Sequence, residues 1–186
     1  MKVTAVLINY KRPADLERVK ENLLQYEFID EIIVWDNTRD NNFVYGRFLA
    51  SRKAKNDVVY TQDDDCIIEN IPEIFATFDG IHLSNGLKPE AIKSYSTRQE
   101  TLLGWGSFFK KDWTYNLDRY VAKYGVDYYL YTNADRIFTS LLPKPFNTIE
   151  AKVVDFPSAT DPSIAMSMQE DFINDRDVAL ERVQKL

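Results

Sequence analysis

The first 65 residues alternate short apolar runs with amphipathic segments, and this alternation constrains the fold more than any other feature of the sequence. Apolar runs at 3–8, at 31–35 and from Val58 are separated by segments at 13–24 and 43–53 with helical spacing of apolar residues. Buried parallel strands are nearly continuous apolar runs, and a crossover helix joins each strand to the next. The order strand, helix, strand, helix, strand therefore predicts an α/β fold with a Rossmann-like, mostly parallel central sheet flanked by helices.

Composition and charge limit what such a fold can do. The 186 residues fit one domain, and the 45% hydrophobic and 13% aromatic residues suffice for a sizeable core. A net charge of −6 argues against a protein that coats nucleic acid or an anionic membrane. No apolar run approaches the roughly 18 residues of a membrane span. Cys66, the one cysteine, excludes an internal disulfide and favours a cytoplasmic, reducing environment; we predict a buried apolar residue rather than a nucleophile.

Three consecutive acids, Asp63, Asp64 and Asp65, end the third apolar run. Ligands of an open α/β sheet bind outside the carboxyl ends of its strands, so the acids stand where such a fold places its chemistry. Adjacent carboxylates repel one another, and Mn²⁺ or Mg²⁺ with substrate phosphates would offset that repulsion using only one or two of them. The alternative is a solvated acidic turn that caps the next helix.

Polar residues follow the two earlier strands as well. Tyr10 and Arg12 follow the first strand, and Asn37 follows the second. Each of them alone is an ordinary loop residue. The carboxyl ends of parallel strands, however, meet at one edge of the sheet. We therefore expect these side chains to converge with the acids on one site.

The chain beyond the acids alternates less regularly. Its patterns predict paired strands at 91–97 and 102–109, a helix from Asp112 to Gly125, further strands at 126–131 and 152–156, and a helix N-capped by Asn133. Asp135 then lies in the first turn of that last helix, where its charge suits the helix dipole. Trp105, followed by Gly106, is either a core residue or an exposed ring on which a sugar stacks.

The final helix, at about 170–185, contains one anomaly. Its apolar residues Phe172, Ile173, Ala179, Leu180 and Val183 share one face, and Arg176 falls in the middle of that face. An unpaired buried charge costs several kcal/mol, so the side chain either extends to the edge of the face or meets a phosphate or carboxylate. We favour the second interpretation. The segment at 156–169 lacks periodicity and is predicted to be a flap.

Several of these motifs together resemble the metal-dependent nucleotide-sugar glycosyltransferases of the GT-A fold, and more narrowly the exostosin-like transferases that act on heparan-type glycans. Asn42 and Arg47 keep the spacing of that family, with Arg47 standing 16 positions before Asp63. The other matching segments are Tyr10-Lys11-Arg12, Val34-Trp35-Asp36-Asn37, Asp63-Asp64-Asp65, Gly106-Ser107-Phe108-Phe109, Asn133-Ala134-Asp135-Arg136 and the last helix with Arg176.

The resemblance implies a single GT-A domain over 1–186, with a nucleotide-binding half at 1–65, an acceptor and active-site half at 66–155, and a flap with a C-terminal helix at 156–186. It implies a hexosyl- or N-acetylhexosaminyltransferase that uses a UDP-sugar and retains the anomeric configuration. The residues that it places at the nucleotide-sugar are Tyr10, Arg12, Asn37, Asn42, Arg47, Asp63 and Asp64. It also implies Mn²⁺ or Mg²⁺ on Asp65, a catalytic role for Asp135 and Arg176, and an acceptor or sugar platform at Trp105 and Gly106.

One departure from the family pattern keeps a second class of function open. The family has two adjacent acids where this chain has Asp135 followed by Arg136. A non-catalytic nucleotide-sugar or glycan-binding module is therefore the main alternative. A sugar-phosphate nucleotidyltransferase needs a glycine-rich loop after the first strand, and 9–13 contains no glycine. Structural Ca²⁺ binding of the EF-hand type needs a glycine and a terminal glutamate at fixed spacing, and the sequence lacks that pattern.

Overall fold

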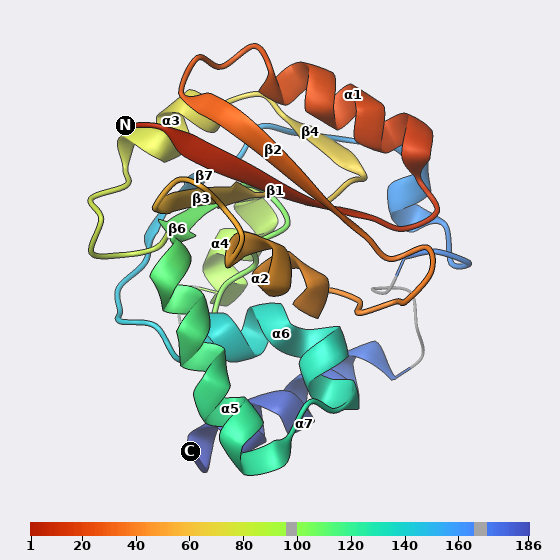
Figure 1. Cartoon of the computed structure of the whole chain (residues 1–186), viewed down its shortest axis with the longest axis vertical. Helices are drawn as coiled ribbons and strands as arrows, with labels where there is room; N and C mark the ends of the chain where they lie inside the picture. Colours follow the sequence, from red (N-terminus) through yellow and green to blue (C-terminus); the bar gives the residue numbers. More distant parts are fainter. Residues whose placement is uncertain (96–99, 166–170) are drawn as a thin grey trace.

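A six-stranded sheet forms the centre of the molecule in this computed structural model, which describes residues 1–95, 100–165 and 171–186 (Figure 1). The strand order is β2-β1-β3-β6-β5-β7. β1 pairs in parallel with β2 and β3, β5 pairs in parallel with β7, and β6 runs antiparallel to both of its neighbours. The strands are β1 (Val3–Asn9), β2 (Ile29–Asp36), β3 (Val58–Thr61), β5 (Ser84–Leu87), β6 (Ser107–Lys110) and β7 (Asn147–Glu150).

Helices cover both faces of this sheet. One layer contains α1 (Pro13–Leu23) and α3 (Ile71–Ala76), and the other contains α2 (Tyr45–Ser51), α5 (Leu117–Tyr124), α6 (Tyr128–Ser140) and α7 (Phe172–Gln184). The remaining elements are α4 (Pro89–Tyr95), the short helices η1 (Lys111–Asn116) and η2 (Pro157–Thr160), and a small sheet of β4 (Cys66–Ile68) with β8 (Val153–Asp155). Alternation along β1 joins the layers, because Val3, Ala5 and Leu7 enter one core and Val6 enters the other.

The predicted fold class is confirmed, since the first 61 residues form β1, α1, β2, α2 and β3 in the expected order. Within the described residues, none of the helices combines the length and the apolar character that crossing a membrane requires.

The prediction of paired strands at 91–97 and 102–109 was wrong in its first member. Pro89 and Glu90 begin α4 instead, because proline and an acidic residue both favour the first helical turn; positions 96 and 97 lie outside the described residues. The second strand is shorter than predicted, as β6 begins only at Ser107. Its neighbour β5 went unpredicted because the sequence Ser-Asn-Gly-Leu lacks β-branched and aromatic residues.

The strand predicted at 126–131 was also wrong, because this segment opens α6. The Asp127 carboxylate accepts a hydrogen bond from the Leu130 amide at 3.0 Å, which makes Asp127 the N-cap. Asn133, the predicted N-cap, instead interrupts the helix with a kink at φ −129° and ψ 23°. The predicted helix start therefore coincides with the point where a second helical segment begins.

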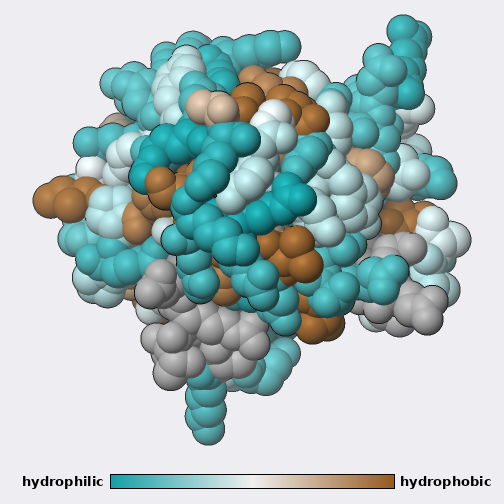
Figure 2. Space-filling view, turned by 90° about the horizontal axis from the view of Figure 1, so that it is seen from below, coloured by the Kyte–Doolittle hydropathy of each residue, from teal (hydrophilic) through white to brown (hydrophobic). Residues whose placement is uncertain are grey.

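Two apolar residues of the predicted helices at 13–24 and 170–185 are exposed rather than buried. Leu24 lies just beyond α1 and is 69% exposed, and Ile173 in the first turn of α7 is 68% exposed. Asp112 makes no capping hydrogen bond in η1, whereas Gly125 ends α5 at φ +77° as predicted. Seen from the side of α5 and α7, exposed hydrophobic residues form separate patches among hydrophilic ones (Figure 2).

Candidate active site

A pocket of about 880 Å³ lies where β1, β2 and β3 end. Its walls include every residue that sequence analysis placed in the site except Asn42 and Gly106. The first wall comes from the strand ends: Tyr10, Arg12, Asn37, Asp63, Asp64 and Asp65. The opposite wall comes from α6 and α7 and includes Asp135 and Arg176. The expected convergence of the three strand ends is therefore present, while the role of each residue stays a prediction.

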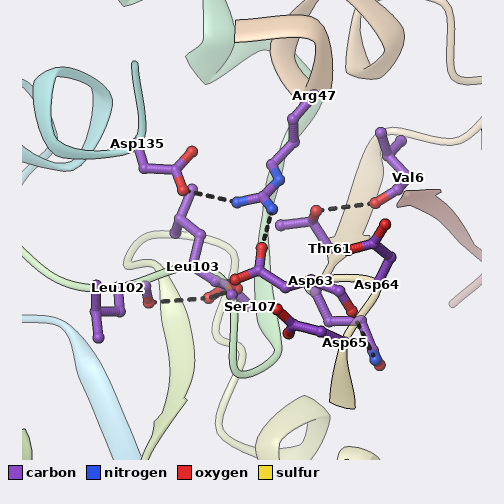
Figure 3. A network of polar contacts seen from close by, with 12 residues as sticks. Val6, Arg47, Thr61, Asp63, Asp64, Asp65, Leu102, Leu103, Ser107 and Asp135 are labelled. Atoms are coloured by element: carbon purple, nitrogen blue, oxygen red, sulfur yellow. Dashed lines mark hydrogen bonds and ion pairs between the residues drawn. The ribbon is translucent and has the colours of Figure 1, made fainter. Parts of the chain in front are cut away.

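Arg47 joins the two walls of the pocket (Figure 3). Its side chain is 1% exposed and projects from α2 between two carboxylates. One nitrogen, Nη1, donates a hydrogen bond to Asp135 Oδ2 at 2.7 Å, and the other, Nη2, donates to Asp63 Oδ1. Burial lowers the pKa of Arg47, but Asp135 and Asp63 raise it by more, so the guanidinium stays charged. The structure thus makes this residue an internal bridge between the site acids.

Burial and mutual repulsion weaken the acidity of the pocket carboxylates. Burial raises the pKa of Asp135 to about 6, against the opposing effect of Arg47. Burial likewise raises the pKa of Asp64 to about 6, with Arg12 opposing it. Burial and the nearby charge of Asp63 raise the pKa of Asp65 to about 7. Burial is the main cause in each case, so the pocket disfavours the charged form of these carboxylates.

Arg12, on the first wall, is the counter-charge of Asp64 and Asp65. Its Nη1 donates to Asp64 Oδ1 at 2.9 Å, and its Nη2 donates to the Ser158 carbonyl at 3.0 Å and lies 3.4 Å from Asp65 Oδ2. The preceding residue, Lys11, has φ +60°, a left-handed conformation uncommon for a residue with a side chain. A strained backbone next to a charged pocket is typical of functional loops.

Asn37 organises the loop after β2 rather than pointing freely into the pocket. It is 2% exposed; its Nδ2 donates to the Phe43 carbonyl at 2.9 Å, and its Oδ1 accepts from the Asn42 amide at 2.9 Å. Phe43 itself has φ +46°. Asn42 does not line the pocket, and its side-chain Nδ2 donates a hydrogen bond to the Asp40 carbonyl at 3.1 Å. These two asparagines hold the loop whose neighbours Asn41 and Phe43 line the pocket.

The loop before β6 reaches the pocket through Trp105 and Gly104. The Trp105 indole is half-buried, and the Lys88 ammonium lies 4.8 Å from its ring centroid. Lys88 also pairs with Asp155 at 2.5 Å. A Cβ on Gly104 would overlap the Asp63 carboxylate, so only glycine permits this close approach. Gly106, with φ +88°, shapes the loop from outside the pocket.

The two arginines of the opposite wall differ in their surroundings. Arg176 is half-buried in the pocket lining, its guanidinium lies 5.0 Å from the Phe172 ring, and its charge helps to lower the pKa of Asp135. Arg136 is 5% exposed and forms an ion pair with the buried Glu100, with Asp177 3.4 Å away. The cation that replaces the second acid of the family pattern is thus paired within the protein.

The fit to a divalent ion rests on the chemistry of the donors. Within the described ranges, no three His, Cys, Asp or Glu side chains are arranged to hold a metal ion by themselves. The buried carboxylate of Asp64 and the half-buried carboxylate of Asp65 nevertheless supply the hard oxygens that Mg²⁺ and Mn²⁺ prefer. Because Mg²⁺ is commonly bound by one or two carboxylates together with substrate phosphates, these residues fit a site completed by a nucleotide.

Sequence reasoning missed several residues of the pocket. Lys88, Gly104 and Asp155 line the pocket. The Ser158 carbonyl lies outside the lining but accepts a hydrogen bond from Arg12. Asp155 ends β8, which pairs with β4 immediately after the acids, and only this pairing brings it near Asp65. The one available signal was Gly104, because a glycine beside an aromatic residue indicates a close backbone approach.

No protein-family model matches the chain. A search of curated protein sequences likewise yields no match. Among solved structures, the crystal structure of S. aureus TarS 1-349 is similar with a TM-score of 0.51 and 12% sequence identity, covering 98% of this chain. This chain spans 65% of the length of that TarS chain. At this identity the likeness concerns the fold alone: the protein is a mixed α/β structure with a central sheet flanked by helices, similar to a glycosyltransferase fold.

Proposed function

We propose that this protein transfers a sugar from a nucleoside diphosphate, UDP in the first instance, to an acceptor hydroxyl. The observation that carries the proposal is the convergence of three strand ends, α6 and α7 on one acid-rich pocket of about 880 Å³. A pocket of this volume suits a nucleotide-sized ligand. The glycosyltransferase-like fold supports the same reaction class.

The first wall would bind the nucleotide. Tyr10 lines it directly, and the loop held by Asn37 presents Asn41 and Phe43 beside it. Asp63 and Asp64 would meet the ribose and the sugar, as their position at the end of β3 allows. Arg12 contributes a guanidinium that can donate two parallel hydrogen bonds to phosphate oxygens.

Charge balance is the main demand of the reaction, because negative charge develops on the leaving diphosphate as the glycosidic bond breaks. A bound Mn²⁺ or Mg²⁺ supplies Lewis-acid stabilisation of that charge, and Asp65 is the residue we assign to hold it. Arg176 lies on the facing wall and would add a fixed positive charge. A pocket so rich in carboxylates binds a diphosphate only together with such cations.

Asp135 would orient the donor sugar or the acceptor hydroxyl. Its Oδ2 is fixed by Arg47, while its Oδ1 is shielded from solvent and makes no hydrogen bond to the described part of the chain. We assign a substrate hydroxyl as the partner of Oδ1 in the complex. With a pKa of about 6, this carboxylate could accept the acceptor proton in an inverting reaction. The proposal favours retention, in which the leaving phosphate takes that proton. Trp105 would provide the apolar side of the acceptor or sugar site.

The proposal is tested first by ligand binding and turnover. A thermal-shift panel of nucleotide sugars, each with and without Mn²⁺, should raise the melting temperature most for UDP-sugars with Mn²⁺. The best ligand is then incubated with the protein, and UDP release is followed with and without candidate acceptors. Binding without transfer or slow hydrolysis of any donor would favour the non-catalytic binding module instead.

The metal assignment has a separate test. Asp65→Ala should reduce Mn²⁺-dependent UDP release by at least about 100-fold, the scale expected when charge stabilisation of a leaving group is lost. Asp57→Ala is the matched control, because its side chain is 95% exposed and does not line the pocket. Undiminished release in Asp65→Ala would remove the metal role from this residue.

A further inference from the structure

We propose that Arg12 is an exchangeable counter-ion: it neutralises Asp64 and Asp65 until a divalent cation binds Asp65, and it then turns toward the diphosphate of the nucleotide. The inference rests on the proposed function, because the cation and the diphosphate are ligands of that same pocket. It goes beyond a fixed nucleotide contact, since it assigns Arg12 two successive partners.

The geometry places one guanidinium on both carboxylates. Nη1 donates to Asp64 Oδ1 at 2.9 Å, and Nη2 lies 3.4 Å from Asp65 Oδ2. The Arg12 side chain is only 9% exposed, so these contacts are shielded from water and carry more energy than a surface ion pair would. Arg12 therefore occupies the space beside Asp65 that a divalent cation would need.

The two cations exclude one another for geometric and electrostatic reasons. Mg²⁺ binds carboxylate oxygens at roughly 2.0–2.1 Å and demands near-ideal octahedral geometry. A guanidinium that lies against the same carboxylates occupies part of that coordination shell, and its positive charge repels the ion. Filling the site therefore requires the side chain of Arg12 to release Asp64 and Asp65.

Once released, the Arg12 guanidinium can bind the diphosphate of a nucleotide in the same pocket. Arg12 lines the pocket, and its Nε is buried without a hydrogen-bond partner in the described part of the chain. A diphosphate would provide acceptors for Nε and for both terminal nitrogens, and guanidinium groups bind phosphate in this bidentate way. When Arg12 leaves Asp64 and Asp65, the hydrogen bond from its Nη2 to the Ser158 carbonyl breaks as well. That hydrogen bond connects Arg12 to η2.

The inference predicts opposite effects of one substitution on two ligands. In Arg12→Gln, the Mn²⁺ dissociation constant measured without nucleotide should fall by about tenfold, because a competing buried charge is gone. In the same variant with saturating Mn²⁺, the UDP dissociation constant should rise by about tenfold, because a charge-assisted phosphate contact is lost. Mn²⁺ is titrated by electron paramagnetic resonance and UDP by calorimetry; uridine, which lacks phosphates, should bind both proteins equally.

Arg18→Gln is the matched control. Arg18 lies on α1, its side chain is 58% exposed, and it contacts Asp15 and the Phe156 ring rather than the pocket acids. Arg18→Gln removes the same charge from the protein as Arg12→Gln, so it controls for the change in net charge. A Mn²⁺ dissociation constant that Arg12→Gln leaves unchanged or raises would overturn the inference, as would unchanged affinity for UDP.

Wild-type protein alone supplies a second measurement, should Arg12→Gln fail to fold. Hydrogen exchange in the peptide 157–165 reports the hydrogen bonds of Asp161 and Ala165 in η2 and the turn that follows. Mn²⁺ without nucleotide should accelerate exchange there, because the link from Arg12 to the Ser158 carbonyl is broken. Unchanged or slower exchange would overturn the inference.

The outcomes separate this inference from the proposed function. If the wild type transfers sugar with Mn²⁺ but the two dissociation constants do not move in opposite directions, only the exchange by Arg12 is overturned. If the opposite shifts are observed but no nucleotide sugar is turned over, the exchange stands and the transferase proposal fails. Absence of Mn²⁺ binding to both the wild type and Arg12→Gln would overturn the exchange together with the metal role.

Discussion

Arg47 Nη1 lies 2.7 Å from Asp135 Oδ2, and the same guanidinium contacts Asp63 on its other side. The contact joins a helix that follows the second strand to a helix that is 88 positions further along the chain. One buried cation thus sets the distance between the wall that would bind the nucleotide and the wall that would act on the sugar.

Removing this cation should destabilise the protein strongly. We expect Arg47→Met to lower the free energy of unfolding by about 3–5 kcal/mol, because Asp135 loses its counter-charge in a buried site. Urea denaturation followed by circular dichroism measures the change. Arg52→Met is the control at the C-cap of the same helix; Arg52 pairs with the more exposed Asp118, and its loss should cost about 1 kcal/mol or less.

A double variant shows whether the cost comes from the uncompensated charge. Arg47→Met with Asp135→Asn should be more stable than Arg47→Met alone, since the buried negative charge is removed as well. Equal or lower stability of the double variant would mean that Arg47 contributes through packing rather than through charge.

Gly104→Ala should disturb the site more than the fold. The new methyl group would overlap the Asp63 carboxylate, which is 44% exposed and can swing outward, away from Arg47. We expect UDP affinity with Mn²⁺ to fall by about tenfold while stability changes by no more than about 1–3 kcal/mol. Calorimetry and urea denaturation measure the two effects. Gly125→Ala, where a Cβ meets no atom within 4 Å, should strain only the left-handed backbone and leave UDP affinity unchanged.

The elevated pKa of Asp135 predicts a pH dependence of known sign. Burial raises its pKa from 3.8 to about 6, so between these values the folded state binds more protons than the unfolded state. Stability contributed by this group is therefore present below about pH 4 and is lost as the pH rises through about 6. The stability difference between wild type and Asp135→Asn, measured by urea denaturation from pH 4 to 7.5, should shift against the wild type as the pH rises.

Asp79 should show the opposite sign. Hydrogen bonds from the His82 side chain and from the amides of His82 and Ile81 hold the pKa of Asp79 well below its usual value of 3.8. Its contribution is present above the unfolded value and lost as the pH falls below it. The advantage of wild type over Asp79→Asn should therefore shrink toward pH 3, and a constant difference would contradict this assignment.

Cys66 should be inert in the folded protein. Its side chain is 0% exposed, and burial raises the pKa of the thiol well above its usual value, so little thiolate forms. A thiol reagent such as dithionitrobenzoate should label it only after denaturation, with one equivalent per chain. Rapid labelling of the native protein would show that the small sheet of β4 and β8 opens readily.

Sequence periodicity was sufficient where each element buries residues of its own. The apolar runs of β1 and β3 and the stripe Leu16, Val19 and Leu23 of α1 are buried as their spacing predicts. The run of β2 is not, because β2 lies at the edge of the sheet and its Val34 is 37% exposed. Periodicity failed for β5, which is a strand only because β6 and β7 pair with it on either side. It failed again at Val126 and Tyr128, where an N-cap at Asp127 outweighs the strand preference of the tyrosines and valine around it.

The residues of the site, like the elements of the fold, could be predicted only in part. Residues directly after strands could be placed, because parallel pairing fixes where Arg12, Asn37 and Asp63 arrive. Side-chain partnerships between distant segments could not be placed. The sequence contains both Arg136 and Glu100 but no signal that they pair, and nothing in the spacing of Arg47 distinguishes a ligand-binding arginine from the buried bridge that it forms.

The order of elements along the chain also has a consequence for synthesis on the ribosome. Arg12 follows β1 and the three acids follow β3, so they emerge before α6 and α7. Arg47 can contact Asp63 as soon as β3 has formed. Asp135 arrives only with α6, and Arg176 only with α7, which buries Ala179 in the core beside α6. A nascent chain therefore contains Asp63, Asp64 and Asp65 before the arginines of the opposite wall, and the pocket becomes complete only when α7 has docked.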